Sequence, residues 1–470
     1  MTMKNLLLAI SLILAGACSS NATSTEIASG FELPEATTAK RNTAQTGDIK
    51  TSDIVREVLA RNPSAAQAAA AISQAQAQLK MRESAFRPQL NFQFSYMLAD
   101  APSAYLFKTI DARSFQPGTN FNEPGSFDNF ETKLELGMNL YAGGAHQLAA
   151  QMAEHGINVS QLQQDLVKQQ LTATTLQTLL GIEGAQQQLK VNIAAMVLID
   201  AQINDVQKHI AAGTTLRSDL LSLQARRSEA HDTKLQAEYA LQTFKAALAM
   251  LLNIDPDDLP QLTTSGDDLR NRYCDVLPEA SQVAVKLAQL KRPEFQSATM
   301  AAMIAKLNVQ QVTASSAPQV NLFGQGWVDQ QELGYDDSDL NYSIGIMVDF
   351  NLLDGGSLSA RELAARAQLS AATSTARLVQ NQVANETRNA FSNLLSAKSR
   401  VEVAAAGIAQ AAESLRLVKV QYENNVATVT RFLEAEQMNF GAQLRLIQAN
   451  LDLQSAQIEL TRATSNFINI

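Results

Sequence analysis

The side chains that most often carry chemistry are few and scattered in this chain. Its four histidines, His146, His155, His209 and His231, form no ligand spacing typical of a metal site. The sequence contains no Walker loop and no HExxH motif, and its two double glycines are too short for a nucleotide-binding loop. The sequence therefore predicts a protein that is not an enzyme and that uses no metal and no cofactor.

The N-terminus offers one candidate modification site. Residues 1–17 combine Lys4, an apolar run and small residues, which is typical of a secretory signal peptide. The segment "AGACSS" resembles a lipobox, which predicts that Cys18 is acylated after cleavage; the alternative is a simple cleaved signal with an incidental cysteine. The only other cysteine is Cys274, so an acylated Cys18 leaves no pair for an intramolecular disulfide. Both alternatives predict export, with residues 18–50 as an extended arm.

Composition excludes some protein classes and favours long helices. The chain of 470 residues has 37 basic and 46 acidic residues, a net charge of −9 that does not suit a nucleic-acid partner. Beyond the signal, no apolar run is long enough for a helical membrane span. Only 11 prolines and 21 glycines interrupt the chain, which favours a few very long helices.

The sequence contains a tandem repeat. "RNPSAAQAA" at Arg61 matches "KRPEFQSAT" at Lys291, and "RPQLNF" matches "APQVNL"; both pairs lie 230 residues apart. "YAGGA" matches "LDGGS", and "AAGTTLRSDLLSLQA" matches "ENNVATVTRFLEAEQ", both 212 apart. The first copy therefore has a longer loop before its double glycine. We predict a first repeat over 51–252, a linker over 253–291 and a second repeat over 292–470.

Each copy follows one predicted plan. A helix (64–86; 294–316) ends before a proline, and two segments of alternating polarity, joined by a polar loop, form a hairpin. A helix of 68 residues (145–212; 357–424), on the order of 100 Å long, reverses and returns as a shorter helix such as 214–252. Apolar residues of the last helix form a coiled-coil seam. The bends between strand and long helix are expected at four glycines: Gly143, Gly144, Gly355 and Gly356.

The four predicted strands have one apolar face and one polar face, and the sequence offers no second sheet to cover them. "LNYSIGIMVDFNLL" (340–353) shows this alternation most clearly. Four strands cannot close a barrel, and an open sheet leaves two exposed edges. Closure between chains resolves this: two chains give eight strands, and three give twelve with room for a channel. The alternative is a soluble sandwich face.

The duplicated plan of proline, strand, strand, double glycine and long helix resembles the outer-membrane efflux protein family, typified by TolC. The likeness runs from about Thr51 to the C-terminus and rests on "RNP", "RPQL", "NLLDGG" and "QYENNVATVTRFLEAEQ". It implies a mainly α-helical protein with a membrane β-barrel, in which a homotrimer closes a twelve-stranded barrel on a long α-helical tunnel. The barrel would contact outer-membrane lipid and the tunnel would extend into the periplasm. A lipidated Cys18 resembles the drug- and metal-efflux branch.

The resemblance also implies a periplasmic gate at the helical turns. In the family the inner turn carries a tyrosine, a glycine and two acidic residues; here Tyr422, Asn425, Arg431 and Glu434 take these positions. Asp219 corresponds to Arg431 in the first copy. Arg431 can pair with Glu434 one turn away, or with Asp219 as a latch between hairpins; a solvated helix end without a gating role is the third alternative. The candidate gate residues are Asp219, Ser222, Tyr422, Arg431 and Glu434.

The same turns are the expected docking surface for the helical hairpin of a periplasmic membrane-fusion adaptor. Small and apolar residues there are Gly213, Leu216, Leu220, Leu221, Val426, Val429, Phe432 and Leu433, and the polar turn residue Asn425 belongs to the same surface. Several of these leucines could instead pack the hairpin core, and we favour that alternative for Leu221 and Leu433.

The predicted function is that of an outer-membrane exit duct for small molecules in a tripartite efflux pump, working with an adaptor and an inner-membrane pump. A duct for protein secretion of type I has the same shape and stays open as an alternative. A periplasmic coiled-coil scaffold without a pore is a further alternative, which leaves the alternating strands without a purpose.

Overall fold

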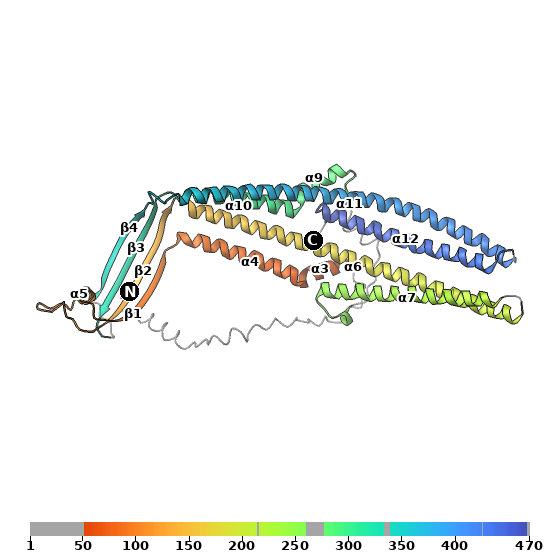
Figure 1. Cartoon of the computed structure of the whole chain (residues 1–470), viewed down its shortest axis with the longest axis horizontal. Helices are drawn as coiled ribbons and strands as arrows, with labels where there is room; N and C mark the ends of the chain where they lie inside the picture. The colour runs from red at the N-terminus through yellow and green to blue at the C-terminus, as the bar shows by residue number, and fades with distance from the viewer. Residues whose placement is uncertain (1–50, 214–215, 260–276, 333–338, 425, 468–470) are drawn as a thin grey trace.

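The structure, a computed structural model, describes residues 51–213, 216–259, 277–332, 339–424 and 426–467. Cys18, Cys274 and Asn425 lie outside the described residues, and so do the predictions on lipidation and on one turn residue. A small sheet stands at one end of the molecule, and long helices run from it to a tip at the other end (Figure 1). This arrangement confirms the predicted mainly helical fold with four strands.

The two long helices have equal length, as the repeat predicts. They are α6 (Ala145–Ala211) and α11 (Ser357–Glu423), each of 67 residues. Two shorter helices lie along each of them, one toward the sheet and one toward the tip (Figure 1). The shorter helices are α4 (Pro63–Glu83) and α7 (Arg217–Leu252) beside α6, and α10 (Pro293–Ala314) and α12 (Val429–Ala463) beside α11. The short helices α3 (Thr51–Arg61) and α9 (Ser281–Lys291) precede α4 and α10.

Proline occupies the first position of both α4 and α10, where its missing N–H costs no hydrogen bond. Asn62 caps α4 by accepting from the Ser64 N–H at 2.9 Å, and its amide donates to the Leu251 carbonyl at 3.0 Å. In the second copy Arg292 takes the place of Asn62; it is buried and pairs with Glu294 and Glu386. Both residues join the start of a helix to neighbouring segments.

The main core lies at mid-length, where the shorter helices meet beside the long ones. Ile54 and Val58 of α3, Leu176 of α6, Leu248 of α7 and Ile458 of α12 are all buried there in one cluster. A corresponding cluster in the second copy joins α9, α11 and α12. The repeat therefore has one core per copy at the level where its helices change partners.

The four strands form one antiparallel sheet in sequence order, β1 (Gln89–Ala99), β2 (Phe127–Ala142), β3 (Gln319–Gln330) and β4 (Asn341–Asp349). Register pairs Phe94 with Thr132, Thr132 with Val328, and Gly324 with Ile344, so these residues share one face. On that face Phe94 is 53% exposed and Ile344 is 72% exposed. The predicted apolar face is confirmed. β4 ends at Asp349 rather than at Leu352, because the following residues already turn toward the double glycine.

The segment between β1 and β2 contains a helix where the sequence predicts a polar loop. Helix α5 (Pro102–Asp111) lies at the end of the sheet that points away from the long helices (Figure 1). Proline begins it, and it packs against β3. The prediction of a plain loop was wrong here, and α5 accounts for much of the extra length of the first copy.

Candidate functional site at the helical tip

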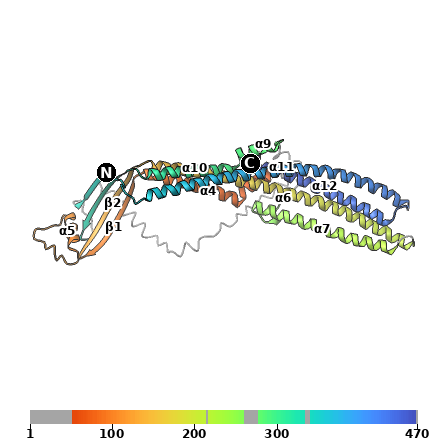
Figure 2. The ribbon, with the colours of Figure 1, turned by 45° about the horizontal axis from the view of Figure 1, so that its top comes forward.

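The candidate gate and docking residues gather where α6, α7, α11 and α12 end together at the tip (Figure 2). The turn after α6 contains Gly213 with φ +73°, a left-handed conformation that glycine adopts without strain. The turn after α11 ends at Thr428, whose hydroxyl caps α12 by accepting from the Arg431 N–H. The returning helix of the first copy begins at Arg217, three residues later than predicted.

Apolar contacts hold the two hairpins together at the tip. Leu433 of α12 is buried against Val206 of α6 and Leu223 of α7, so it bridges the two copies. Phe432 packs inside the second hairpin, where its ring is parallel to that of Tyr422 with centroids 5.0 Å apart. The tyrosine of the predicted gate therefore closes the α11–α12 turn through a stacked pair.

Among the described residues, Arg431 of the predicted gate pairs within its own helix rather than with Asp219 of the other hairpin. Arg431 and Glu434 form an ion pair at 3.5 Å on α12, with both side chains more than half exposed. Asp219 forms no ion pair with Arg431, but its charge and that of Asp205 lie near Tyr422. Burial, and then these two carboxylates, raise the pKa of the Tyr422 hydroxyl. Asp219 thus acts on the tyrosine through its charge, and Arg431 pairs with Glu434 instead.

The remaining candidate residues for the gate and for docking fall into an exposed group and a half-buried group. Ser222 is exposed, and its hydroxyl donates to the Ser218 carbonyl of its own helix at 3.0 Å. Leu216 and Val426 are 70% and 77% exposed, whereas Leu220 and Val429 are half-buried between the hairpins.

Leu433 is buried as expected, but Leu221 is 57% exposed, so the expectation that it packs the core was wrong. Leu220 and Leu223 take the inward positions of this turn of α7, and Leu221 therefore points away.

Two polar contacts between the hairpins were missed by the sequence analysis. Gln202 of α6 donates to the Glu436 carboxylate of α12 at 2.6 Å, and Arg226 of α7 lies 3.4 Å from the Gln437 amide oxygen. Glu436 is only 9% exposed. Its position four residues after Phe432 and three after Leu433 places a carboxylate on an apolar helix face, and that pattern is the signal that could have revealed it.

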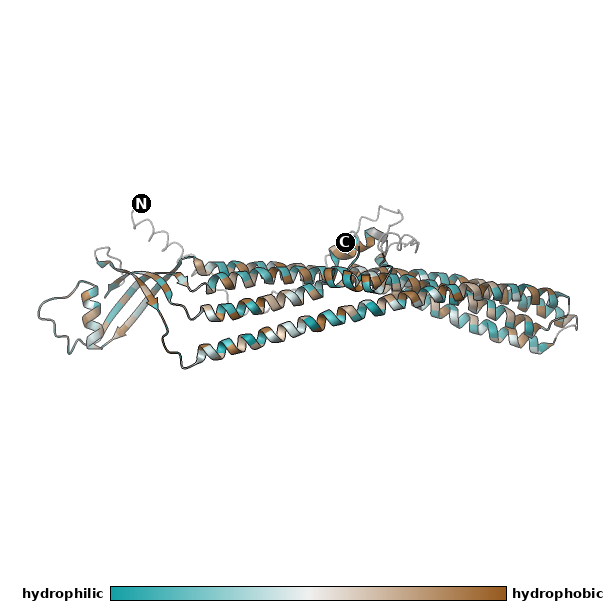
Figure 3. Ribbon diagram, turned by 90° about the horizontal axis from the view of Figure 1, so that it is seen from above, coloured by the Kyte–Doolittle hydropathy of each residue, from teal (hydrophilic) through white to brown (hydrophobic). Residues whose placement is uncertain are grey.

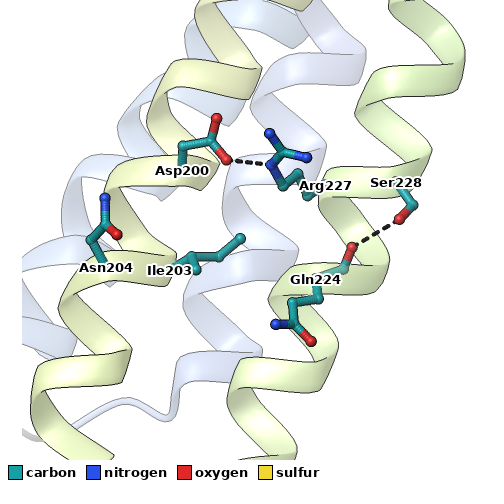
Figure 4. Close-up of a pocket in the computed structure, with 6 residues that line it drawn as sticks. All are labelled: Asp200, Ile203, Asn204, Gln224, Arg227 and Ser228. Atoms are coloured by element: carbon teal, nitrogen blue, oxygen red, sulfur yellow. Dashed lines mark hydrogen bonds and ion pairs between the residues drawn. The ribbon is translucent and has the colours of Figure 1, made fainter.

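A shallow groove of about 470 Å³ lies between α6 and α7, on the side of the tip turn that leads toward mid-length. Asp200 of α6 and Arg227 of α7 form an ion pair across it (Figure 4). Polar side chains surround the pair, and Ile203 is the apolar residue among the six that line the groove. Both ion-pair partners are nearly half exposed, so the pair contributes little to stability. The groove lacks the apolar lining that small-molecule sites usually have.

Glu436 makes the stability of the tip depend on pH. Burial raises its pKa, which the Gln202 hydrogen bond and the nearby Arg226 and Lys419 charges only partly oppose. Its contribution to stability is therefore fully present below the ordinary glutamate pKa and is lost as the pH rises through the raised value. Glu436→Gln is expected to raise the free energy of unfolding at about pH 7.5 by on the order of 1 kcal/mol, with no gain at about pH 4.5.

Thermal unfolding of both proteins at the two pH values checks this prediction. Glu434→Gln, a change of an exposed carboxylate two residues away, is the matched control and is expected to show no such pH-dependent gain. An equal effect of Glu436→Gln at both pH values would show that folding does not raise the pKa of this carboxyl group.

No helix among the described residues is both long and apolar enough to cross a membrane. Hydrophobic and hydrophilic residues instead alternate along the long helices (Figure 3). Within the described part of the chain, histidine, aspartate and glutamate form no group of three that would hold a metal ion.

Comparison with known proteins gives consistent matches. The family profile of the outer membrane efflux proteins matches residues 54–253 and 284–466. The outer membrane efflux protein BepC of Brucella suis biovar 1 is 24% identical over 384 residues, 81% of this chain and 78% of that protein. A crystal structure of CusC superposes with a TM-score of 0.76 at 18% identity, covering 89% of this chain and 92% of CusC. A membrane protein of Pseudomonas aeruginosa gives a TM-score of 0.77 at 19% identity, with the same coverage.

These matches confirm the resemblance found in the sequence and span both copies of the repeat. They also agree with the apolar sheet face and the long helical hairpins described above. The chain therefore belongs to the outer membrane efflux protein family, the TolC-like channels of the outer membrane, and it extends from that membrane into the periplasm.

Proposed function

We propose that three copies of this chain form one channel, and that the channel is the exit duct of a tripartite efflux pump. The sheets of the three copies close a twelve-stranded barrel in the outer membrane, and their helices continue it as a tunnel through the periplasm. An adaptor joins the tunnel tip to an inner-membrane pump, which supplies the energy. The duct itself carries small molecules passively and performs no catalysis.

The proposal rests on the contact between the first and second copies of the repeat, which we call the internal junction and which the described chain contains once. β2 of the first copy pairs with β3 of the second, and α10 packs against both α6 and α11. A Cβ added to Gly143 would lie 2.4 Å from the Ala314 carbonyl oxygen and from the Ala317 Cβ, so the first bend abuts the end of α10.

The outer sides of the chain lack this junction. β1 and β4 are the edges of the described sheet, and among the described helices α4 packs chiefly along α6. Gly355, the counterpart of Gly143, has nothing within 4 Å of an added Cβ. Ser84 and Arg87, the counterparts of Ala314 and Ala317, are exposed. If β4 of one chain pairs with β1 of the next as β2 pairs with β3, both edge strands gain a partner. Repeating this contact generates a closed ring of chains.

Ring size follows from the strand count. Two chains would give eight strands, whose interior is filled by side chains, whereas three give twelve and leave space for solutes. The polar sheet face then lines the lumen, and the exposed apolar face, which includes Phe94 and Ile344, contacts lipid.

At the tip we propose that Asp219, Ser222, Tyr422, Arg431 and Glu434 form the periplasmic gate. The exposed Arg431–Glu434 pair alone is worth only ~0.2–1 kcal/mol, so a gating effect depends on its repetition around the ring. Arg431→Ala and Glu434→Ala are each expected to increase the conductance of the purified channel in a planar bilayer. Arg416→Ala, which breaks the exposed Arg416–Glu413 pair on the other helix of this hairpin, α11, serves as the control. A conductance unchanged by all three substitutions would remove these charges from the gate and leave the channel intact.

Docking of the adaptor is assigned to Gly213, Leu216, Leu220, Asn425, Val426 and Val429. A photo-crosslinking residue at Val426, which is 77% exposed, is expected to capture a periplasmic adaptor in intact cells. The same residue at Leu395, 52% exposed toward mid-length of α11, provides the matched control. Capture of a secreted polypeptide at the tip without an adaptor would favour a protein-secretion duct instead.

A further inference from the structure

Helix α5 lies against the polar face of the sheet, which lines the lumen of the proposed channel. Lys108 bonds to Asp329 of β3 at 2.8 Å and to Glu131 of β2. At the end of the helix, the Asp111 carboxylate accepts from the Trp327 indole at 3.3 Å, and its carbonyl accepts from the Asn341 amide at 2.8 Å. The strand register pairs Glu131 with Asp329 and Trp327 with Asn341 on the face opposite Phe94 and Ile344. All four sheet partners therefore lie on the polar face.

Helix α5 is attached to the sheet by specific hydrogen bonds and ion pairs, which centre on Asp329. Asp329 is fully buried, and besides Lys108 it accepts from the Asn129 amide at 2.8 Å. Its second carboxylate oxygen has no hydrogen-bond partner, so Lys108 supplies most of the compensation for this buried charge. The contact joins residues 221 positions apart. Detaching α5 would leave Asp329 without its cation.

The opposite side of α5 is apolar and uncovered in the chain. Phe107 is 65% exposed and Ile110 is 47% exposed; they lie three residues apart and therefore share one helix face. Because α5 is held against the inner wall, this face points toward the axis of the lumen. Three copies would place a set of aromatic and aliphatic side chains around the pore at its outer end.

We propose that α5 is a constriction at the external mouth of the channel, fastened to the barrel wall by Lys108 and opened when that contact breaks. This inference rests on the proposed trimeric channel. It assigns to the external end a barrier separate from the periplasmic gate. Solutes that leave the tunnel must displace α5 or pass between the three copies of Phe107 and Ile110.

The test measures access to the lumen from outside the cell. A reporter Gln93→Cys, on the polar face of β1 and nearer the long helices than α5, is placed in a Cys274→Ser background. A bulky, membrane-impermeant maleimide is added to intact cells. Lys108→Met is expected to raise the labelling rate about tenfold, because breaking a buried ion pair far exceeds what a tenfold shift in opening requires. A small maleimide is expected to label both proteins.

Three controls keep the result interpretable. Lys108→Arg keeps the cation and is expected to retain slow labelling, and Lys245→Met on α7 removes a lysine far from the sheet. Gln116→Cys, an exposed residue of the β1–β2 segment, reports the accessible surface in every variant. Asp329→Asn breaks the same contact from the other side and replaces Lys108→Met if that variant fails to form oligomers.

The outcomes separate the two proposals. Fast labelling in Lys108→Met or Asp329→Asn, and slow labelling in Lys108→Arg, supports the constriction. Equal labelling in a protein that remains trimeric and conducting overturns the constriction and leaves the channel standing. A protein that forms no oligomer and no pore before any substitution overturns both.

Discussion

Phe94→Arg is expected to prevent assembly of the channel in the outer membrane, whereas Gln93→Arg at the preceding position is expected to be tolerated. The two residues lie at the middle of β1 on opposite faces, and Phe94 belongs to the exposed apolar face. Arginine on the lipid face near the bilayer midplane costs about 2–4 kcal/mol, and a trimer carries that cost three times. On the lumen side the same charge stays in water.

The measurement is the amount of heat-resistant oligomer in the outer-membrane fraction of cells that express each variant. Near loss for Phe94→Arg with a wild-type level for Gln93→Arg is the expected pattern. Equal levels for the two variants would contradict the assignment of this face to lipid and would favour the soluble sandwich or scaffold alternatives.

Gly143→Ala is expected to destabilise the folded chain much more than Gly144→Ala in the same bend. Both glycines have positive φ, 64° and 87°, where an alanine costs about 1–2 kcal/mol. Only the Cβ at position 143 would collide with the Ala314 carbonyl oxygen and the Ala317 Cβ, a further cost of ~1–3 kcal/mol because backbone cannot move aside as a side chain can. Thermal unfolding of both variants in detergent measures the difference.

The counterpart Gly355→Ala separates folding from assembly. In the single chain it carries only the backbone strain, since its φ is 65° and an added Cβ meets nothing within 4 Å. If the internal junction is repeated between chains, this Cβ meets the neighbour's copy of the Ser84–Arg87 segment. Gly355→Ala is therefore expected to reduce the yield of oligomer more than Gly144→Ala does. Equal yields would argue that the two junctions differ in geometry.

Much of the fold could be predicted because prolines and glycines mark the starts of helices and the bends in both copies of the repeat. The prolines at 63 and 293 begin helices, the double glycines precede α6 and α11, and the two long helices have the same length. Strand alternation predicted which sheet face is apolar. These features depend on local backbone preferences and on side-chain periodicity, which one sequence displays directly.

The parts that were missed depend on contacts between distant segments. α5 is a ten-residue helix, too short to be stable alone, and its attachment joins Lys108 to Asp329. The Gln202–Glu436 and Asp200–Arg227 contacts likewise join separate helices, so spacing within one segment can mark Glu436 as unusual but cannot identify the partner of either residue. For the same reason the sequence left open whether Arg431 pairs with Glu434 or with Asp219, and the folded chain selects Glu434.

The channel is tested most directly by the single-channel conductance, in a planar bilayer, of detergent-extracted protein whose mass in solution is known. We expect a particle of three chains and discrete conductance steps. A monomer or dimer that gives no steps would contradict the channel and leave a periplasmic coiled-coil scaffold as the explanation for the long helices.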